Sequence, residues 1–126
     1  MAPHFSSGNR PRVVVVDDQP SFRAAARRLL TARGYDVVAE AGCAATALDA
    51  VERHAPDGVL LDVRLGDDDG FEVCDLLRRS RPELAILLAS TDEHDPTLVA
   101  RSGARGFVHK SRMHKIDFRE TWPRQP

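Results

Sequence analysis

Five short apolar runs alternate along the chain with longer segments in which apolar residues recur every three or four positions. The runs are rich in β-branched residues and lack polar alternation, which is typical of strands covered on both faces of a sheet. Strands that alternate with helices predict a parallel sheet with right-handed crossovers. The predicted strands span residues 12–16, 35–39, 58–62, 84–89 and 105–109.

The segments between these strands predict amphipathic helices. In the first helix, Pro20 lies in the opening turn, where its missing N–H group costs little, and Gly34 ends the helix as a C-cap. After the second strand we predict a loop at residues 40–42. Further helices are predicted at residues 43–54, 71–80 and 97–102.

The segment after position 110 has a weaker helical pattern than the rest of the chain. We predict a last helix that starts at Arg112 and is ended by Pro123. Its apolar residues, Met113, Ile116 and Phe118, do not form one continuous stripe. The pattern therefore defines the packing face of this helix poorly.

Length and charge limit the function classes. With 126 residues the chain has room for one domain. Its net charge of -1 and pI of about 6.5 give no overall positive field for nucleic acid or an anionic membrane. No apolar run is long enough to cross a bilayer or to form a secretory signal. We expect a cytoplasmic protein with a folded domain at residues 12–122 and tails at 1–11 and 123–126.

Polar side chains stand at the ends of four of the five strands. Because the carboxyl ends of parallel strands meet at the same edge of a sheet, we expect these side chains to be neighbours. They are Asp17 and Asp18 after the first strand, Asp62 at the end of the third, Ser90 after the fourth and Lys110 after the fifth.

This set of residue types favours chemistry on a phosphoryl group. Three carboxylates at one point repel one another and raise each other's pKa values, unless a cation lies between them. Mg²⁺ prefers oxygen ligands and retains waters that a phosphoryl oxygen can replace. Lys110, one of only two lysines, supplies a second positive charge. We therefore interpret Asp62 as a nucleophile that accepts a phosphoryl group.

Four motifs, in this order, resemble the receiver domain of two-component response regulators. They are VVVVDD at residues 13–18, DVRLGDDDG at 62–70, AST at 89–91 and GFVHK at 106–110. The resemblance covers most of the chain, from about Arg12 to Lys110. It implies an α/β, flavodoxin-like fold, in which a five-stranded parallel sheet of order 2-1-3-4-5 lies between two layers of helices.

The resemblance also implies roles for the acidic residues. Asp62 matches the aspartate that accepts the phosphoryl group. Asp18 and Asp62 match the direct Mg²⁺ ligands, whereas Asp17 matches a residue that acts partly through water. Arg64 matches the position whose backbone carbonyl completes the metal site.

The remaining motif positions imply a switch. Ser90 matches the switch hydroxyl, Phe107 the switch aromatic residue and Lys110 the family's lysine, and residues 69–70 match the pair that opens the third helix. The phosphoryl donor implied is a histidine kinase or a histidine phosphotransfer protein. The expected protein is a stand-alone receiver domain that signals through another protein. Beyond self-catalysed phosphotransfer and autodephosphorylation, it is not expected to be an enzyme.

Departures from the family pattern lie mostly on the side that docks partners. The stretch from Ser90 to Lys110 is short, and Pro96 falls at the start of its helix. Phe107 lacks a hydroxyl group, and Ser111 stands where proline is common. These departures leave open a second hypothesis, an interaction module that works without phosphorylation.

Other interpretations also stay open at the residue level. A small Mg²⁺-dependent phosphatase with an aspartyl nucleophile would need a carboxylate two residues after Asp62, where Arg64 stands. Phe107 is either a fixed core residue or a rotating switch, and Ser90 could instead bond a local backbone group. The five histidines are interpreted as surface residues, although His94, in the loop after Ser90, could approach the phosphoryl group.

Overall fold

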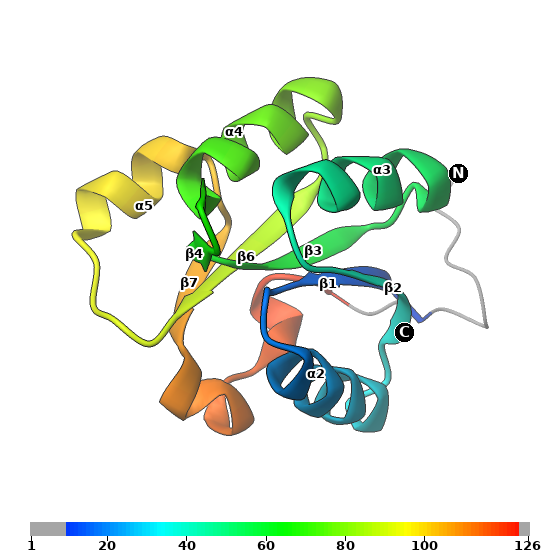
Figure 1. Cartoon of the computed structure of the whole chain (residues 1–126). Coiled ribbons are helices and arrows are strands. Elements are labelled where there is room, and N and C mark those ends of the chain that lie inside the picture. The colour runs from blue at the N-terminus through cyan, green and yellow to red at the C-terminus, as the bar shows by residue number, and fades with distance from the viewer. Residues whose placement is uncertain (1–9, 124–126) are drawn as a thin grey trace.

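A parallel sheet lies between two helical layers in the computed structural model, which describes residues 10–123 (Figure 1). The strand order is β2-β1-β3-β6-β7, which confirms the predicted flavodoxin-like order for five strands. Among the described residues, no helix has the length and apolar character that crossing a membrane requires. The strands of this sheet are β1 (Arg12–Val16), β2 (Asp36–Ala41), β3 (Gly58–Asp62), β6 (Ala85–Ser90) and β7 (Gly106–His109).

The sheet divides the core into two halves, and helices cover one half on each face. Alternate strand residues point to opposite faces, so Val14 and Val16 join one apolar cluster while Val13 and Val15 join the other. In Figure 1, α3, α4 and α5 cover one face, and α2 with the C-terminal segment covers the other. The helices are α2 (Pro20–Ala32), α3 (Ala44–His54), α4 (Gly70–Ser80) and α5 (Pro96–Ser102).

The predicted loop at residues 40–42 is wrong at its start, because β2 continues to Ala41. Glu40 and Ala41 pair in parallel register with Val15 and Val16. Pairing with β1, which lies far away in the sequence, therefore extends β2 beyond its own apolar run. The other strand and helix bounds agree with the predictions to within one residue, apart from the last helix.

The acidic stretch after β3 contains a small antiparallel hairpin of β4 (Arg64–Leu65) and β5 (Asp68–Asp69). Gly66 adopts a φ of 64° in its turn, a conformation that favours glycine. Asp68 Oδ2 accepts a hydrogen bond of 2.9 Å from the Ala44 N–H group. This bond ties the hairpin to the start of α3.

The predicted α-helix from Arg112 is absent from the described residues. In its place are two 3₁₀ turns, η1 (Lys110–Lys115) and η2 (Phe118–Glu120). The apolar side chains of this segment are spaced too irregularly for one α-helical face. Short turns with a bend between them allow Met113 and Phe118 to point into the core, where both are buried.

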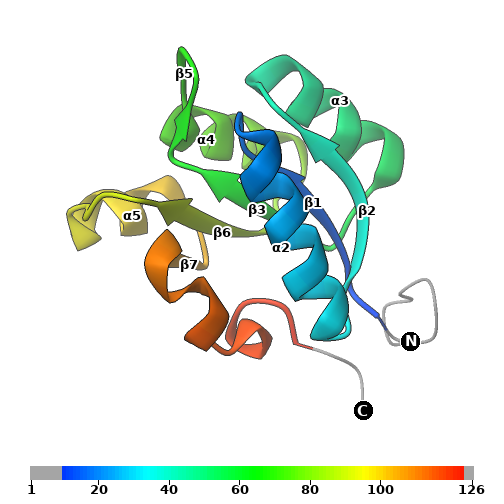
Figure 2. The ribbon, with the colours of Figure 1, turned by 60° about the horizontal axis from the view of Figure 1, so that its bottom comes forward.

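Tyr35, Phe118 and Trp122 form an aromatic cluster between these turns and the sheet. Trp122 stacks on Phe118 and meets the edge of Tyr35. The Tyr35 hydroxyl donates a hydrogen bond of 2.8 Å to the Trp122 carbonyl, and the Trp122 indole N–H donates one of 2.9 Å to the Ala85 carbonyl. Figure 2 shows the C-terminal turns beside α2, on the same side of the sheet. These aromatic side chains therefore cover this part of the sheet in place of the predicted last helix.

Candidate functional site

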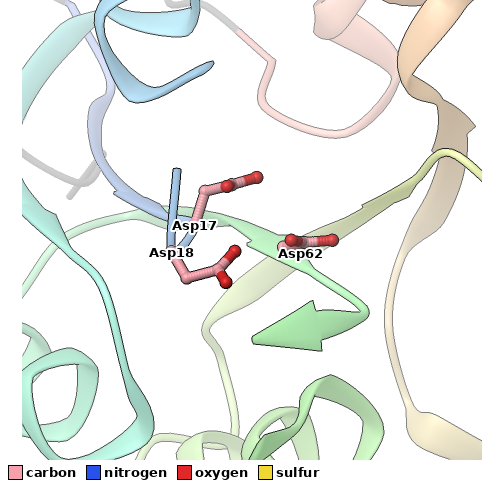
Figure 3. A group of neighbouring side chains, drawn as sticks. All are labelled: Asp17, Asp18 and Asp62. Atoms are coloured by element: carbon pink, nitrogen blue, oxygen red, sulfur yellow. The ribbon is translucent and has the colours of Figure 1, made fainter. Parts of the chain in front are cut away.

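Three carboxylates gather at the carboxyl edge of the sheet, as predicted. Asp17 and Asp18 follow β1, and Asp62 ends the neighbouring strand β3 (Figure 3). Each residue offers a carboxylate oxygen, and the three oxygens lie within 4.8 Å of one another. Parallel pairing of β1 with β3 brings residues that are 45 positions apart to the same point.

The two inner carboxylates are buried and oriented by the backbone. Asp17 is fully buried, and its Oδ1 accepts a hydrogen bond of 2.9 Å from the Gln19 N–H group. Asp62 is 6% exposed, and its Oδ1 accepts one of 3.2 Å from the Arg64 N–H group. Asp18 is exposed, so it leaves the cluster open to solvent on one side.

The start of α4 lies against the end of β3 and helps to fix Asp62. The Gly70 N–H group donates a hydrogen bond of 2.7 Å to the Val63 carbonyl. A Cβ atom on Gly70 would overlap the backbone of Asp62 and Val63, so only glycine permits this approach. Asp69 caps the helix by accepting a hydrogen bond of 2.9 Å from the Phe71 N–H group. Asp69 therefore caps α4, and Gly70 allows the start of α4 to pack against the end of β3.

Lys110 supplies the cation nearest to the cluster in the part of the chain described. Its Nζ lies 2.6 Å from Asp17 Oδ2 and 3.4 Å from Asp62 Oδ2. The same ammonium lies 4.2 Å from the centre of the Phe22 ring, in cation–π geometry. No sequence signal relates Phe22 to a lysine 88 positions away.

Burial, and after it the Asp17 carboxylate, raises the pKa of Asp62 to about 6. The Lys110 ammonium and the Arg64 N–H group oppose this shift without cancelling it. One lysine therefore does not compensate the charge of the cluster. The cluster's donors are carboxylate oxygens with one open side, which fits a hard divalent cation such as Mg²⁺.

Ser90 ends β6 and is 2% exposed. Its Oγ accepts a hydrogen bond of 3.0 Å from the Asp92 N–H group and lies 3.1 Å from His94 Nε2. The His94 ring meets the rings of Phe71 and Phe107 edge-on, each with centroids 5.6 Å apart. His94, expected at the surface, is half-buried between these groups.

A cavity of about 660 Å³ opens over the cluster. Predicted site residues that line it are Asp18, Asp62, Arg64, Ser90 and Lys110. Asp17 lies beneath it, held by Lys110. Phe107 is half-buried and lines a different hollow, on the side of α5.

Residues 13–117 match the family model described as "Response regulator receiver domain". The chain belongs to the response regulator receiver domain family.

Curated relatives are longer regulatory proteins. The chain is 40% identical over 102 residues to "DNA-binding response regulator MtrA" of Mycolicibacterium smegmatis, a match that covers 80% of this chain and 44% of MtrA. It is 39% identical over 103 residues to "Probable transcriptional regulatory protein NarL" of Mycobacterium tuberculosis, covering 79% and 47%. The chain therefore spans about half the length of the curated relatives it matches.

Solved receiver structures share the fold. The signal receiver domain of the putative response regulator NarL from Mycobacterium tuberculosis has a TM-score of 0.74 at 35% identity, covering 85% of this chain and 92% of that one. A two-component response regulator of the LuxR family from Aurantimonas sp. SI85-9A1 has a TM-score of 0.77 at 33% identity, covering 81% and 75%. Receiver domains are signalling domains, so family membership speaks against the small-phosphatase hypothesis.

In this receiver domain, Arg64 does not fit the role of a general acid. Its side chain is exposed and forms an ion pair of 3.5 Å with Asp92 at the rim of the cavity. No carboxylate therefore stands at the position that an aspartyl-nucleophile hydrolase would use. The ion pair joins the start of β4 to the loop after β6.

Proposed function

We propose that this receiver domain, placed at residues 12–122, accepts a phosphoryl group on Asp62 with Mg²⁺ and changes the surface formed by α5 and β7. The observation that carries this proposal is the position of Asp62. It is a buried carboxylate at a strand end, with two further carboxylates within 4.8 Å and an ammonium at 3.4 Å.

The metal proposal assigns a role to each acidic residue. Asp18 and Asp62 hold Mg²⁺ directly, Asp17 acts partly through water, and Arg64 contributes its backbone carbonyl. Bound Mg²⁺ would supply charge neutralisation for the oxygens of the phosphoryl group. The raised pKa of Asp62 supports this assignment, because a cation next to the carboxylate favours its charged form.

Phosphotransfer requires Asp62 to act in its ionised form. A carboxylate oxygen of Asp62 forms the new P–O bond, while the P–N bond of a phosphohistidine donor breaks. The donor ring, protonated on its other nitrogen, takes the bonding electron pair and leaves as a neutral imidazole. Lys110, already 3.4 Å from Asp62 Oδ2, pairs with an oxygen of the transferred group.

The switch proposal uses the other two strand ends. A phosphoryl group adds negative charge and acceptor oxygens above Asp62. The Ser90 hydroxyl donates a hydrogen bond to one of them, and the loop that follows β6 moves with it. The result is a population shift at α5 and β7. The proposed partners are a histidine kinase or histidine phosphotransfer protein as donor, and a protein that reads the shifted surface.

A small acyl-phosphate donor tests the proposal without a kinase. With Mg²⁺, wild type should gain the mass of one phosphoryl group, and chelation of Mg²⁺ should abolish the gain. The Asp62→Asn variant should not be labelled. Asp75→Asn, at an exposed aspartate on α4 that pairs with Arg79, is the matched control and should be labelled as wild type. Equal labelling of wild type and Asp62→Asn would refute the proposal, as would no labelling of either.

A further inference from the structure

His94 occupies the space between the site and the hollow beside α5. Its Nε2 lies 3.1 Å from the Ser90 Oγ. Its ring contacts Phe71, at the start of α4, and Phe107, in β7. One side chain therefore touches the switch hydroxyl and the switch aromatic residue at the same time.

The hydrogen bonds of Ser90 make its hydroxyl dependent on His94. A hydroxyl carries one proton and two acceptor positions. The Asp92 N–H group fills one acceptor position. If His94 Nε2 carries a proton, it fills the second, and the Ser90 proton remains available for an oxygen above Asp62. If Nε2 is unprotonated, it takes the Ser90 proton itself.

The loop that carries His94 is anchored at both ends. At its start, Asp92 bonds to Ser90 through its N–H group and to Arg64 through its carboxylate. At its end, Asp95 caps α5 by accepting a hydrogen bond of 2.8 Å from the Thr97 N–H group. His94 is adjacent to this cap, so a displacement of its ring passes directly to the first turn of α5.

The far side of His94 faces a surface hollow of about 440 Å³. Pro96 and Val99 of α5 and Phe107 of β7 line this hollow together with His94. The His94 ring meets Phe107 edge-on, so this one side chain links Ser90 to Phe107 in addition to the pairing of β6 with β7.

We propose that His94 is a positioning residue that fixes the Ser90 hydroxyl and transmits its movement to α5 and Phe107. This inference rests on the proposed function, since the movement of Ser90 begins with a phosphoryl group on Asp62. In the free protein, His94 holds Ser90 by its hydroxyl. When Ser90 turns toward the phosphoryl group, the bond to His94 breaks, and the ring shifts against Phe71 and Phe107.

The first test uses the free protein and needs no phosphoryl group. Long-range ¹H–¹⁵N spectra report the Nε2 resonance of each histidine side chain. The Ser90→Ala variant should move the His94 Nε2 resonance, because its hydrogen-bond partner is removed. The resonance of His114, an exposed histidine in η1, is the internal control and should stay in place. An unchanged His94 resonance would overturn the inference.

The second test uses Mg²⁺ with beryllofluoride, a phosphoryl mimic, followed by amide chemical shifts. In wild type, amides next to Asp17 and Asp62 should shift, and so should those of Phe107 and α5. In His94→Ala the first group should shift as before, while the response of the second group falls to less than half of the wild-type value. His114→Ala is the matched control and should respond fully.

Two conservative variants separate the two contacts of His94. His94→Gln keeps an N–H donor at a similar reach and should preserve the shift of the Ser90 amide while losing most of the response in α5. His94→Phe keeps the ring contacts with Phe71 and Phe107 but cannot form the hydrogen bond to Ser90. The shift of the Ser90 amide should therefore be lost in this variant. If His94→Ala shows the full α5 response, the relay is refuted, and the proposed function stands. If wild type shows no shift near Asp62, the proposed function fails, and the relay with it.

Discussion

The backbone bonds that orient the site side chains are short in range, whereas the hydrogen bonds of the aromatic cluster join distant positions. At the site, the side chains of Asp17, Asp62 and Ser90 each accept a hydrogen bond from the N–H group two residues further along the chain. In the aromatic cluster, Tyr35 bonds to Trp122 across 87 positions, and Trp122 bonds to Ala85 across 37. Each of these site side chains is therefore oriented locally at its own strand end, and the Lys110–Asp17 contact, across 93 positions, joins distant ends. The aromatic cluster instead depends on chain segments that meet only in the folded protein.

The two regions also contribute opposite terms to stability. The site buries like charges, a cost that is visible in the raised pKa of Asp62. The aromatic cluster buries large apolar side chains, of which Phe118 and Trp122 are each 2% exposed. We expect perturbations of the cluster to act mainly on folding, and perturbations of the site to act on charge, pH response and signalling.

Removal of the Trp122 side chain should produce the largest effect. Trp122→Ala leaves a cavity against Phe118 and frees the Ala85 carbonyl, so we expect a loss of about 3–5 kcal/mol in the free energy of unfolding. Denaturant unfolding measures this change. Leu98→Ala, at a leucine that is 44% exposed on α5, is the control and should cost under about 1 kcal/mol. A comparable loss in both variants would contradict the covering role of the cluster.

Removal of the Lys110 ammonium should have the next largest effect. Lys110→Ala leaves Asp17 and Asp62 without their nearest cation, so we expect a loss of roughly 2–4 kcal/mol at pH 7. The loss should shrink on acidification, as Asp62 takes up a proton. The variant should still accept a phosphoryl group from a small donor, but lose the conformational response in amide chemical shifts.

The only other lysine, Lys115, provides a matched control for this charge change. It is exposed at the end of η1, so Lys115→Ala should leave stability and response close to wild type. A Lys110→Ala protein that responds as fully as Lys115→Ala would count against the assigned role.

A methyl group at Gly58 should disturb the aromatic cluster from the sheet side. A Cβ atom there would overlap the indole ring of Trp122, so Gly58→Ala should lower the free energy of unfolding by about 1–3 kcal/mol. At Gly42 the nearest atom to an added Cβ is the flexible Arg23 Nη1, at 3.4 Å, so Gly42→Ala is the control. Equal stability of the two variants by denaturant unfolding would mean that the indole ring can move away without cost.

Neutralising Asp62 should stabilise the metal-free protein, by roughly 1–2 kcal/mol at pH 7 in Asp62→Asn. The folded-state pKa of about 6 lies above the ordinary value of 3.8 for an unperturbed aspartate. The folded wild type therefore binds a proton more tightly, and its stability falls as pH rises between these two values. The advantage of the variant should be complete above pH 6 and vanish below pH 4, as thermal unfolding at several pH values would record. Asp75→Asn should show no such pH dependence, and a destabilised Asp62→Asn at pH 7 would contradict the electrostatic account.

Pattern and local chemistry were enough to predict the sheet and the position of the site residues at its edge. The Val13–Val16 run before Asp17, and the apolar run that ends on Asp62, define strands whose ends must meet in a parallel sheet. The identities of the metal ligands and of the switch residues came from family resemblance, and they remain proposals.

What the sequence did not predict depends on contacts between distant segments. β2 continues through Glu40 and Ala41 because these two residues pair with β1. Trp122 lies between η2 and the sheet, where its indole N–H donates a hydrogen bond to the Ala85 carbonyl. Nothing in the sequence around Trp122 predicts this contact. His94 contacts Phe71 and Phe107 only because α4, β7 and the loop after β6 meet in space. Spacing within one element cannot reveal such contacts.

The central claim, that Asp62 is the residue that accepts the phosphoryl group, can be tested by locating the group chemically. Wild type is incubated with a small acyl phosphate and Mg²⁺, reduced with borohydride and digested, and the peptides are mapped by mass spectrometry. Reduction converts an aspartyl phosphate to homoserine. The account predicts homoserine at position 62 and nowhere else in the chain. Homoserine at position 17, 18 or another acidic residue, with aspartate intact at 62, would contradict it.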